Sequence, residues 1–215
     1  MTLNKNDFIE IDFVGKIKDT GAVFDSNIRE VLEKLNPENK NLDEQSKKFS
    51  FALGHGMFIQ GVDDFLIGKN EGKHLIELFP EKSFGKRDAK LIQIIPLNLF
   101  AKHNQNPVPG MIFNLDNRLA KILSVNSGRV SVDFNHPLAG KEIIYEVDVK
   151  RKISDLNEKA KSLIEFLFRQ PLKFEIKDKK IILEIQKEIK PFAELFKDKF
   201  KELLELELET KKLEK

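Results

Sequence analysis

Few side chains in this 215-residue sequence could perform covalent or metal-dependent chemistry. It contains no cysteine, which excludes thiolate nucleophiles, thiolate metal sites and disulfides, and four scattered histidines argue against a multi-histidine metal site. His55 and His136 each stand beside glycine or proline and are better explained as turn residues than as ligands. Asp25 follows Phe24, where an isolated carboxylate most simply ends a strand. The sequence therefore predicts neither a metal nor a cofactor.

Phenylalanine supplies nearly all of the aromatic surface, with 18 Phe, one Tyr and no Trp. Such rings carry no polar group, so they fill either a core or an apolar pocket. The alternating pattern around Phe51 and Phe79 favours the core. Phe24, Phe58 and Phe84 lie in loops near Asp or Gly, where the residue pattern alone leaves both roles open.

Alternation of apolar and polar residues predicts the strands that would position these side chains. In the first half of the chain it covers residues 8–17, 49–53 and 73–79, with a shorter extended segment at 23–25. These strands carry most of the candidate aromatic residues.

Helical spacing of apolar residues predicts helices over residues 27–35 and 62–67. Gly68 is well placed to end the second helix because glycine adopts the left-handed conformation at a helix C-terminus. The polar residues 36–47 are predicted to be a surface loop.

Beyond this half, short strand candidates at residues 111–113, 118–125 and 129–134 predict a small β-rich module. Asn-His-Pro-Leu-Ala-Gly at 135–140 follows it and precedes another alternating run at 143–149. Taken alone, this turn sequence is a hairpin connection. The alternative is a hinge between two small domains.

Longer elements characterise the C-terminal part of the chain. Residues 150–152, Lys-Arg-Lys, are most simply a solvated linker. A capped helix over 156–167, a hairpin over 172–185 and a helix over 191–203 are predicted next. Residues 204–213 alternate Leu with Glu, which fits either a last strand or an extension of the helix.

The composition is that of a soluble globular protein, with 40% hydrophobic and 33% charged residues. A net charge of +2 is too small to attract nucleic acid through the electrostatic field of the whole protein, so no nucleic-acid partner is predicted. No apolar run approaches the roughly 18 residues that a membrane span requires, and the N-terminus lacks a signal-peptide core. We expect a cytoplasmic protein without a membrane partner.

Several motifs resemble the FKBP family of peptidyl-prolyl isomerases. They are Ile11-Asp12-Phe13-Val14-Gly15, Gly21-Ala22-Val23-Phe24-Asp25-Ser26, Phe49-Ser50-Phe51-Ala52-Leu53-Gly54, Phe58-Ile59-Gln60-Gly61-Val62 and Ser83-Phe84-Gly85. The insertion after Gly85, with residues 135–141 and the strand that follows, is similar to the SlyD-type branch, in which an insert-in-flap chaperone domain interrupts the FKBP loop. The resemblance covers about residues 5–152, and the tail looks like the extra C-terminal domain of long archaeal-type FKBPs.

This resemblance implies an α+β fold in which an antiparallel FKBP-like half-barrel sheet surrounds a short helix. It also implies a small β-rich inserted domain and a separate α+β C-terminal domain. The expected domains are a discontinuous isomerase domain at 1–89 plus 138–152, an insert-in-flap domain at 90–137 and a C-terminal domain at 153–215. The C-terminal domain is expected to form a homodimer.

The resemblance also implies the site residues. The expected catalytic residues are Phe13, Phe24, Asp25, Phe58, Ile59, Phe84 and Tyr145, and Phe49 and Val62 are expected to bind substrate beside them. Rotation about a prolyl amide has a barrier of roughly 18–20 kcal/mol. A water-excluding aromatic slot that fits the twisted amide lowers this barrier without a nucleophile or metal. In the family pattern, the backbone N–H of Ile59 holds a substrate carbonyl.

Two departures from the family pattern bear on activity. Phe13 and Phe84 stand where the family usually has tyrosine, and Val62 stands where many members have a larger floor residue. Loss of a hydrogen bond from a tyrosine hydroxyl to the substrate costs on the order of 1 kcal/mol, which lowers the rate by less than tenfold. We therefore expect reduced but real isomerase activity and weak binding of macrolide-type inhibitors. Tyr145, the only tyrosine, occupies a position where the family often has phenylalanine.

The inserted module carries more apolar residues than a small domain can easily bury. By resemblance, it is expected to capture unfolded, proline-containing polypeptides and pass them to the isomerase pocket. The expected substrate-binding residues of this module are Leu99, Phe100, Val108, Met111, Ile112 and Phe113.

Two alternatives remain open at this point. The protein could be a non-catalytic chaperone with a degenerate pocket, or its tail could bind ribosomes or other partners, although its balanced charge argues against a nucleic-acid surface. No nickel site is expected, because the chain lacks the histidine-rich tail of SlyD-type proteins.

Overall fold

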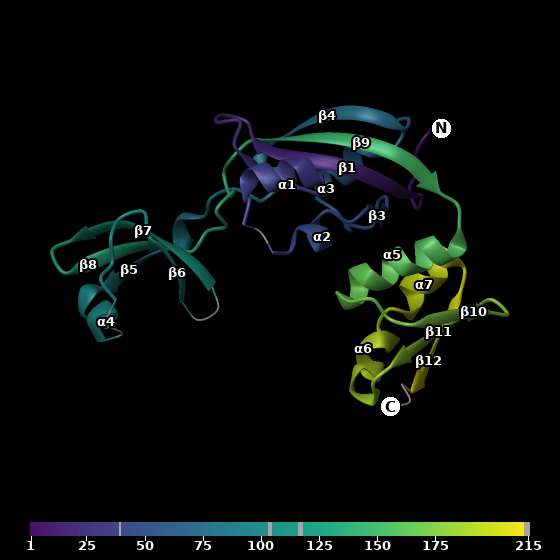
Figure 1. The fold of residues 1–215 in the computed structure, drawn as a ribbon. Coiled ribbons are helices and arrows are strands. Elements are labelled where there is room, and N and C mark those ends of the chain that lie inside the picture. Colours follow the sequence, from purple (N-terminus) through teal and green to yellow (C-terminus); the bar gives the residue numbers. More distant parts are fainter. Residues whose placement is uncertain (39, 103–104, 116–117, 213–215) are drawn as a thin grey trace. The chain divides into compact units, whose positions relative to one another are not determined.

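The computed structural model describes residues 1–38, 40–102, 105–115 and 118–212 (Figure 1). The chain forms two compact units. The main unit contains Met1–Leu78 and Ile144–Lys215, and the inserted unit contains Phe79–Ile143. Leu213, the end of the predicted last element, lies outside the described residues.

A five-stranded sheet with strand order β2-β1-β9-β4 is the centre of the main unit, and β3 pairs with β1. The pairs of β1 with β2 and with β3 are antiparallel. Buried apolar residues of β1, β3 and β9 form its core. Burial alternates along most of β9, as the sequence pattern predicts, whereas consecutive residues Phe8–Ile11 of β1 are all buried. The strands are β1 (Phe8–Ile17), β2 (Val23–Ser26), β3 (Phe49–Ala52), β4 (Gly72–Leu78) and β9 (Ile143–Ile153).

Three short helices accompany this sheet, namely α1 (Arg29–Leu35), α2 (Leu42–Gln45) and α3 (Gln60–Leu66). The prediction of a plain loop over residues 36–47 was wrong because α2 forms there. A four-residue helix is too short to show an apolar period, so the sequence pattern could not reveal it. Gly68 follows α3 with a φ of +82°, the left-handed conformation expected of it.

The inserted unit is a four-stranded sheet with strand order β5-β8-β7-β6. Its strands are β5 (Ile92–Pro96), β6 (Ile112–Leu115), β7 (Arg118–Asn126) and β8 (Arg129–Asp133). Helix α4 (Leu97–Lys102) and the 3₁₀ turns Pro80–Lys82 and Ala89–Leu91 complete it. Its buried cluster consists of Phe100, Phe113, Ala120, Ile122, Val130 and Val132.

The turn at residues 135–140 connects two different sheets, since β8 belongs to the inserted unit and β9 to the five-stranded sheet. The hairpin interpretation of this turn was therefore wrong. Polar contacts join the segment that leads into the inserted sheet to the segment that leads out of it. Arg87 Nη2 lies 2.5 Å from Asp133 Oδ2. The Asn135 side chain accepts from Asp88 N–H and donates to the Asp88 carbonyl. These bonds fix both connections within the inserted unit.

The C-terminal part of the main unit contains one long helix, α5 (Leu156–Phe168), packed with a three-stranded sheet of order β10-β11-β12. The strands are β10 (Phe174–Lys177), β11 (Lys180–Ile185) and β12 (Glu207–Lys212), and β11 pairs with β12 in parallel. The described end of the chain is thus a strand rather than an extended helix. The prediction of a single helix over 191–203 was wrong. The chain forms separate helical segments there, namely the 3₁₀ turn Lys187–Ile189, α6 (Lys190–Glu194) and α7 (Lys197–Leu204).

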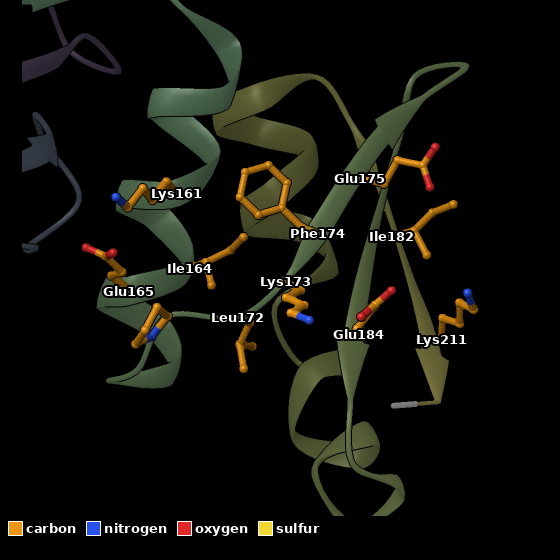
Figure 2. Close-up of a pocket in the computed structure, with 11 residues that line it drawn as sticks. Lys161, Ile164, Glu165, Leu172, Lys173, Phe174, Glu175, Ile182, Glu184 and Lys211 are labelled. Atoms are coloured by element: carbon orange, nitrogen blue, oxygen red, sulfur yellow. The ribbon is translucent and has the colours of Figure 1, made fainter. Parts of the chain in front are cut away.

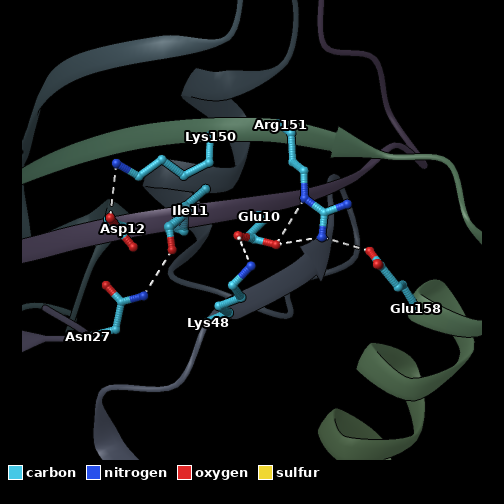
Figure 3. Close-up of polar contacts among 8 residues, drawn as sticks. All are labelled: Glu10, Ile11, Asp12, Asn27, Lys48, Lys150, Arg151 and Glu158. Carbon is cyan, nitrogen blue, oxygen red and sulfur yellow. Dashed lines mark hydrogen bonds and ion pairs between the residues drawn. The ribbon is translucent and has the colours of Figure 1, made fainter.

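Residues 150–152 are not a linker, as the charge pattern suggested, but the end of β9. Arg151 donates to Glu10 at 2.7 Å and to Glu158 at 2.8 Å (Figure 3). Burial by itself would raise the pKa of Glu10, but hydrogen bonds from Arg151 and Lys48 outweigh it and lower the pKa below its usual value. A run of cations can therefore belong to a strand when acids stand opposite it.

Candidate active site

Six of the predicted site residues come together on the five-stranded sheet and the loop before α3. Phe13 lies on β1, Phe24 and Asp25 on β2, Phe49 on β3 and Tyr145 on β9. Phe58 belongs to the loop between β3 and α3. Strands that are distant in the sequence thus bring their aromatic residues to one place.

Close ring contacts define this aromatic cluster. The ring centre of Phe13 lies 5.0 Å from that of Phe58 and 5.7 Å from that of Phe49. Tyr145 lies 5.4 Å from Phe58 and 5.7 Å from Phe24, both in edge-to-face geometry. These separations are in the favourable range for aromatic pairs, which hold the rings in fixed orientations.

One hydroxyl and one carboxylate interrupt the apolar surface. Tyr145 is fully buried, and its hydroxyl donates to Asp25 Oδ2 at 3.2 Å. Burial raises the pKa of the Asp25 carboxyl above its usual value, although hydrogen bonds from the Tyr145 hydroxyl and the Ser26 N–H act in the opposite direction. Burial and the Asp25 charge together raise the pKa of Tyr145, so it stays protonated and remains a donor.

Gly15 permits this cluster to close. A Cβ atom at Gly15 would lie 2.8 Å from the Phe24 ring and 3.1 Å from the Tyr145 ring. The first distance is shorter than a normal carbon contact, so any larger residue would displace Phe24. The glycine is needed here for close approach and not for its backbone conformation.

Two buried polar residues that were not predicted as site residues position the cluster. Asn27 accepts from the Phe13 N–H at 2.8 Å and donates to the Ile11 carbonyl at 2.9 Å (Figure 3). Asp63 accepts from the N–H groups of Gly54 and Gly56, at 2.6 and 3.0 Å, and so shapes the loop that carries Phe58. A polar residue directly after a strand was the available signal for Asn27. Asp63 lies in the first turn of α3, where an acid also suits the helix dipole, so its sequence position gives no separate signal.

Ile59 and Val62 lie at the beginning of α3. Ile59 immediately precedes the helix, and its carbonyl accepts from Val62 and Asp63. Val62 has no exposed surface and belongs to the core beneath the cluster. Among the described residues, no hydrogen bond from the Ile59 N–H is found, so this group can hold a substrate carbonyl as the family pattern implies.

A cavity of about 570 Å³ opens beside the cluster, with Phe13, Phe24, Asp25 and Phe49 in its wall. This volume is in the range typical of small-ligand sites. Phe58, Ile59, Val62 and Tyr145 do not line it, although Phe58 and Tyr145 contact residues that do.

The remaining predicted residues belong to the inserted unit. Phe84 stacks on His136 with ring centres 4.7 Å apart, and its place relative to the aromatic cluster stays a prediction. Phe100 and Phe113 are buried in the core of the unit. Four other apolar residues predicted to bind substrate are exposed, namely Leu99 at 44%, Val108 at 55%, Met111 at 40% and Ile112 at 59%.

Within the part of the chain that the structure describes, no group of three or more histidine, aspartate and glutamate side chains is arranged to hold a metal ion. No described helix is both long and apolar enough to cross a membrane.

Comparison with known proteins identifies the family. The model of the FKBP-type peptidyl-prolyl cis-trans isomerase family matches residues 1–100, and that of the FKBP26 IF domain matches residues 93–138. A short-type peptidyl-prolyl cis-trans isomerase from Methanocaldococcus jannaschii is 34% identical over 151 residues, which cover 69% of this chain and 92% of that protein. The chain therefore belongs to the FKBP-type peptidyl-prolyl cis-trans isomerases, which are enzymes.

More distant relatives place the chain within this class. An FKBP-type isomerase named SlyD from Pasteurella multocida is 29% identical over 109 residues, covering 48% of this chain and 54% of that protein. The structure of AtFKBP13 matches 71% of this chain and 82% of that chain at 16% identity, with a TM-score of 0.37, which is too low to add to the argument. The predicted resemblance to FKBP isomerases, including SlyD, is confirmed.

Proposed function

We propose that this isomerase also binds unfolded polypeptide and accelerates folding steps that are limited by proline isomerisation. The observation that carries the isomerase part is the aromatic cluster around Phe13, Phe58 and Tyr145 beside an open cavity, in which the buried Tyr145 donates to the partly buried Asp25 carboxylate. These residues fit a reaction that needs shape and exclusion of water rather than a nucleophile.

The geometry supports a mechanism of differential binding. Phe13, Phe24 and Phe49 offer apolar walls for the pyrrolidine ring. A twisted prolyl amide loses conjugation, and its carbonyl then behaves more like a ketone that the apolar surroundings tolerate better than the planar amide dipole. Tyr145 fixes the Asp25 side chain at the edge of this site, which keeps the carboxylate orientation constant.

Isomerisation of a proline-containing tetrapeptide tests this part of the proposal. The wild type should accelerate cis/trans exchange, measured by NMR exchange spectroscopy, and Asp25→Ala should reduce kcat/KM by about tenfold, equivalent to one lost charged hydrogen-bond partner. Exchange at the uncatalysed rate with the wild type would instead support the alternative, a non-catalytic chaperone.

The polypeptide-binding part rests on the inserted unit. Its buried cluster is small, while Ile94, Val108, Ile112 and Leu119 are each more than half exposed. Exposed apolar surface of this kind on a small domain suits binding of unfolded chains. Suppression of the aggregation of a reduced, unfolded protein measures this activity, and no suppression at a tenfold molar excess would refute it.

We further propose that the C-terminal domain forms a homodimer. Leu195, directly after α6, is 74% exposed, and Phe192 on α6 is 46% exposed, so a partner subunit could cover them. Sedimentation equilibrium of the wild type should give twice the chain mass. Leu195→Glu should shift it toward the monomer, and a monomeric wild type would refute the proposal.

A further inference from the structure

The cavity beside the aromatic cluster has a second wall, which comes from the C-terminal domain. Phe24 and Asp25 lie on one side, and Glu165, Arg169 and Pro171 lie on the other. The cavity volume of about 570 Å³ is much larger than one pyrrolidine ring requires. The part of the cavity near α5 can therefore hold residues that neighbour the proline.

Helix α5 is bonded to the sheet rather than joined to it only by the chain. The Ser162 hydroxyl donates to the Ser50 carbonyl of β3 at 2.5 Å, and Ser162 is only 8% exposed. Arg151 connects Glu10 on β1 with Glu158 in the first turn of α5 (Figure 3). Loss of these partly buried contacts would cost free energy, which favours a fixed position for α5 beside the site.

A second hollow adjoins this cavity along α5. A groove of about 510 Å³ beside β10 shares Glu165 and Pro171 with the cavity, and Leu172 and Phe174 form part of its apolar lining (Figure 2). Strand β10 is at the edge of its sheet. Edge strands present free backbone hydrogen-bonding groups to an extended polypeptide.

Glu165, which lines both the cavity and the groove, and Arg169, which lines the cavity, are available for binding. Neither Glu165 nor Arg169 forms an ion pair with any residue in the described part of the chain. Arg169 lies with its guanidinium 5.1 Å from the centre of the Phe166 ring instead. An acid and a base one helical turn apart can bind backbone amide groups of a passing chain as well as charged side chains.

We propose that Glu165 and Arg169 are specificity-determining residues that bind the substrate segment next to the isomerised proline. This segment continues into the groove between α5 and β10. The occupant is the polypeptide substrate itself, because the groove shares Glu165 and Pro171 with the cavity beside the aromatic cluster. The proposal rests on the isomerase function proposed above and adds that the C-terminal domain discriminates long substrates from short ones.

Two peptides with the same central X-Pro bond, of four and ten residues, test this proposal with the full-length protein. The wild type should show a lower KM for the longer peptide. Arg169→Ala and Glu165→Ala should each raise the KM of the longer peptide about five- to tenfold, as expected for one lost hydrogen bond to a charged group. They should leave kcat and the constants for the shorter peptide unchanged. Lys190→Ala, an exposed cation of the same domain that lines neither hollow, is the matched control.

Two results would overturn the proposal: equal KM ratios for the two peptides in the wild type and both variants, or faster turnover of both peptides by Arg169→Ala or Pro171→Ala. The second result would mean that this segment obstructs the cleft. Absence of turnover by the wild type would refute the isomerase function instead. In that case, fluorescence anisotropy of the labelled peptides would still decide whether the longer one binds more tightly through Arg169.

Discussion

The aromatic cluster and the inserted unit use apolar side chains in opposite ways. In the cluster, Phe13 is 6% exposed and Tyr145 is fully buried, and ring contacts between strands fix each side chain. In the inserted unit, Met111 and Ile112 are 40% and 59% exposed beside a small buried cluster. One region gives a defined slot, and the other gives an adaptable surface.

This difference agrees with the two tasks that we propose. Isomerisation requires a pocket that distinguishes a twisted amide from a planar one, so its walls must not move. Binding of unfolded chains requires contact with many different sequences, for which uncovered and flexible apolar residues are suitable. Each region can therefore be disrupted without the other, and the following predictions use this separation.

The largest effect is expected from Gly15→Ala. The added Cβ would lie 2.8 Å from the Phe24 ring, so the ring must move out of the cluster. A displacement of about 1 Å in a positioned group can reduce kcat/KM by about a hundredfold, which the tetrapeptide exchange assay would detect. Aggregation suppression by the inserted unit should be unchanged.

Gly21→Ala is the matched control for this variant. Gly21 has a φ of +68° and no atom within 4 Å of the added Cβ, so its substitution strains a turn but does not reach the cluster. It should lower stability by about 1 kcal/mol and leave kcat/KM unchanged. Equal activity of the two alanine variants would show that Phe24 does not need its present position.

A second, smaller effect is expected from Met111→Ser combined with Ile112→Ser. Removing this exposed apolar surface should slow catalysed refolding of a proline-limited protein by about tenfold, because part of the burial energy of two side chains is lost. Tetrapeptide isomerisation should stay unchanged.

The control for this surface is Leu75→Ser on β4. Leu75 is 61% exposed, which is comparable to Ile112, but it lies outside the inserted unit. Refolding should proceed at the wild-type rate with this variant. If both serine variants slowed refolding equally, general apolar exposure would explain the effect and the inserted unit would have no special role.

A still smaller effect is expected from Tyr145→Phe. The variant loses the hydrogen bond to Asp25 but keeps the ring contacts, so kcat/KM should fall about three- to tenfold. Phe13 lies on β1, the strand next to β9, with its ring centre 6.0 Å from that of Tyr145. The double variant Phe13→Tyr/Tyr145→Phe should recover part of the activity if a hydroxyl near Asp25 is what matters. A double variant no better than Tyr145→Phe would show that the donor must come from β9.

The sequence predicted the residues of the cluster but not the bonds between them. Alternation placed Phe13 and Tyr145 on strands, and the family resemblance assigned them to one pocket. The hydrogen bond from Tyr145 to Asp25 joins residues 120 positions apart, and no local pattern encodes such a contact. A hydroxyl from β9 thus reaches a carboxylate on β2, which only the three-dimensional arrangement reveals.

Two of the incorrect predictions share a physical cause, since each judged charged or polar residues by their neighbours in sequence. Arg151 was assigned to a solvated linker, but it lies on β9 opposite Glu10. The turn at 135–140 was compatible with a hairpin until the sheets of β8 and β9 were known to differ. Ion pairing and strand pairing between distant segments decided both cases.

The smallest effect expected is a change in the pH dependence of stability in Asp25→Asn. Because burial raises the pKa of Asp25 in the folded state, the charged form is disfavoured there, and stability is lost as the pH rises from the unfolded value of about 3.9 through the folded pKa. Asparagine has no charge to bury and can still accept from Tyr145. The variant should therefore match the wild type near pH 3 and be slightly more stable at pH 7, as measured by urea denaturation. A variant less stable than the wild type at pH 7 would mean that the Tyr145–Asp25 bond outweighs the cost of burying the carboxylate, and the cluster would then depend on its charge as well as on its packing.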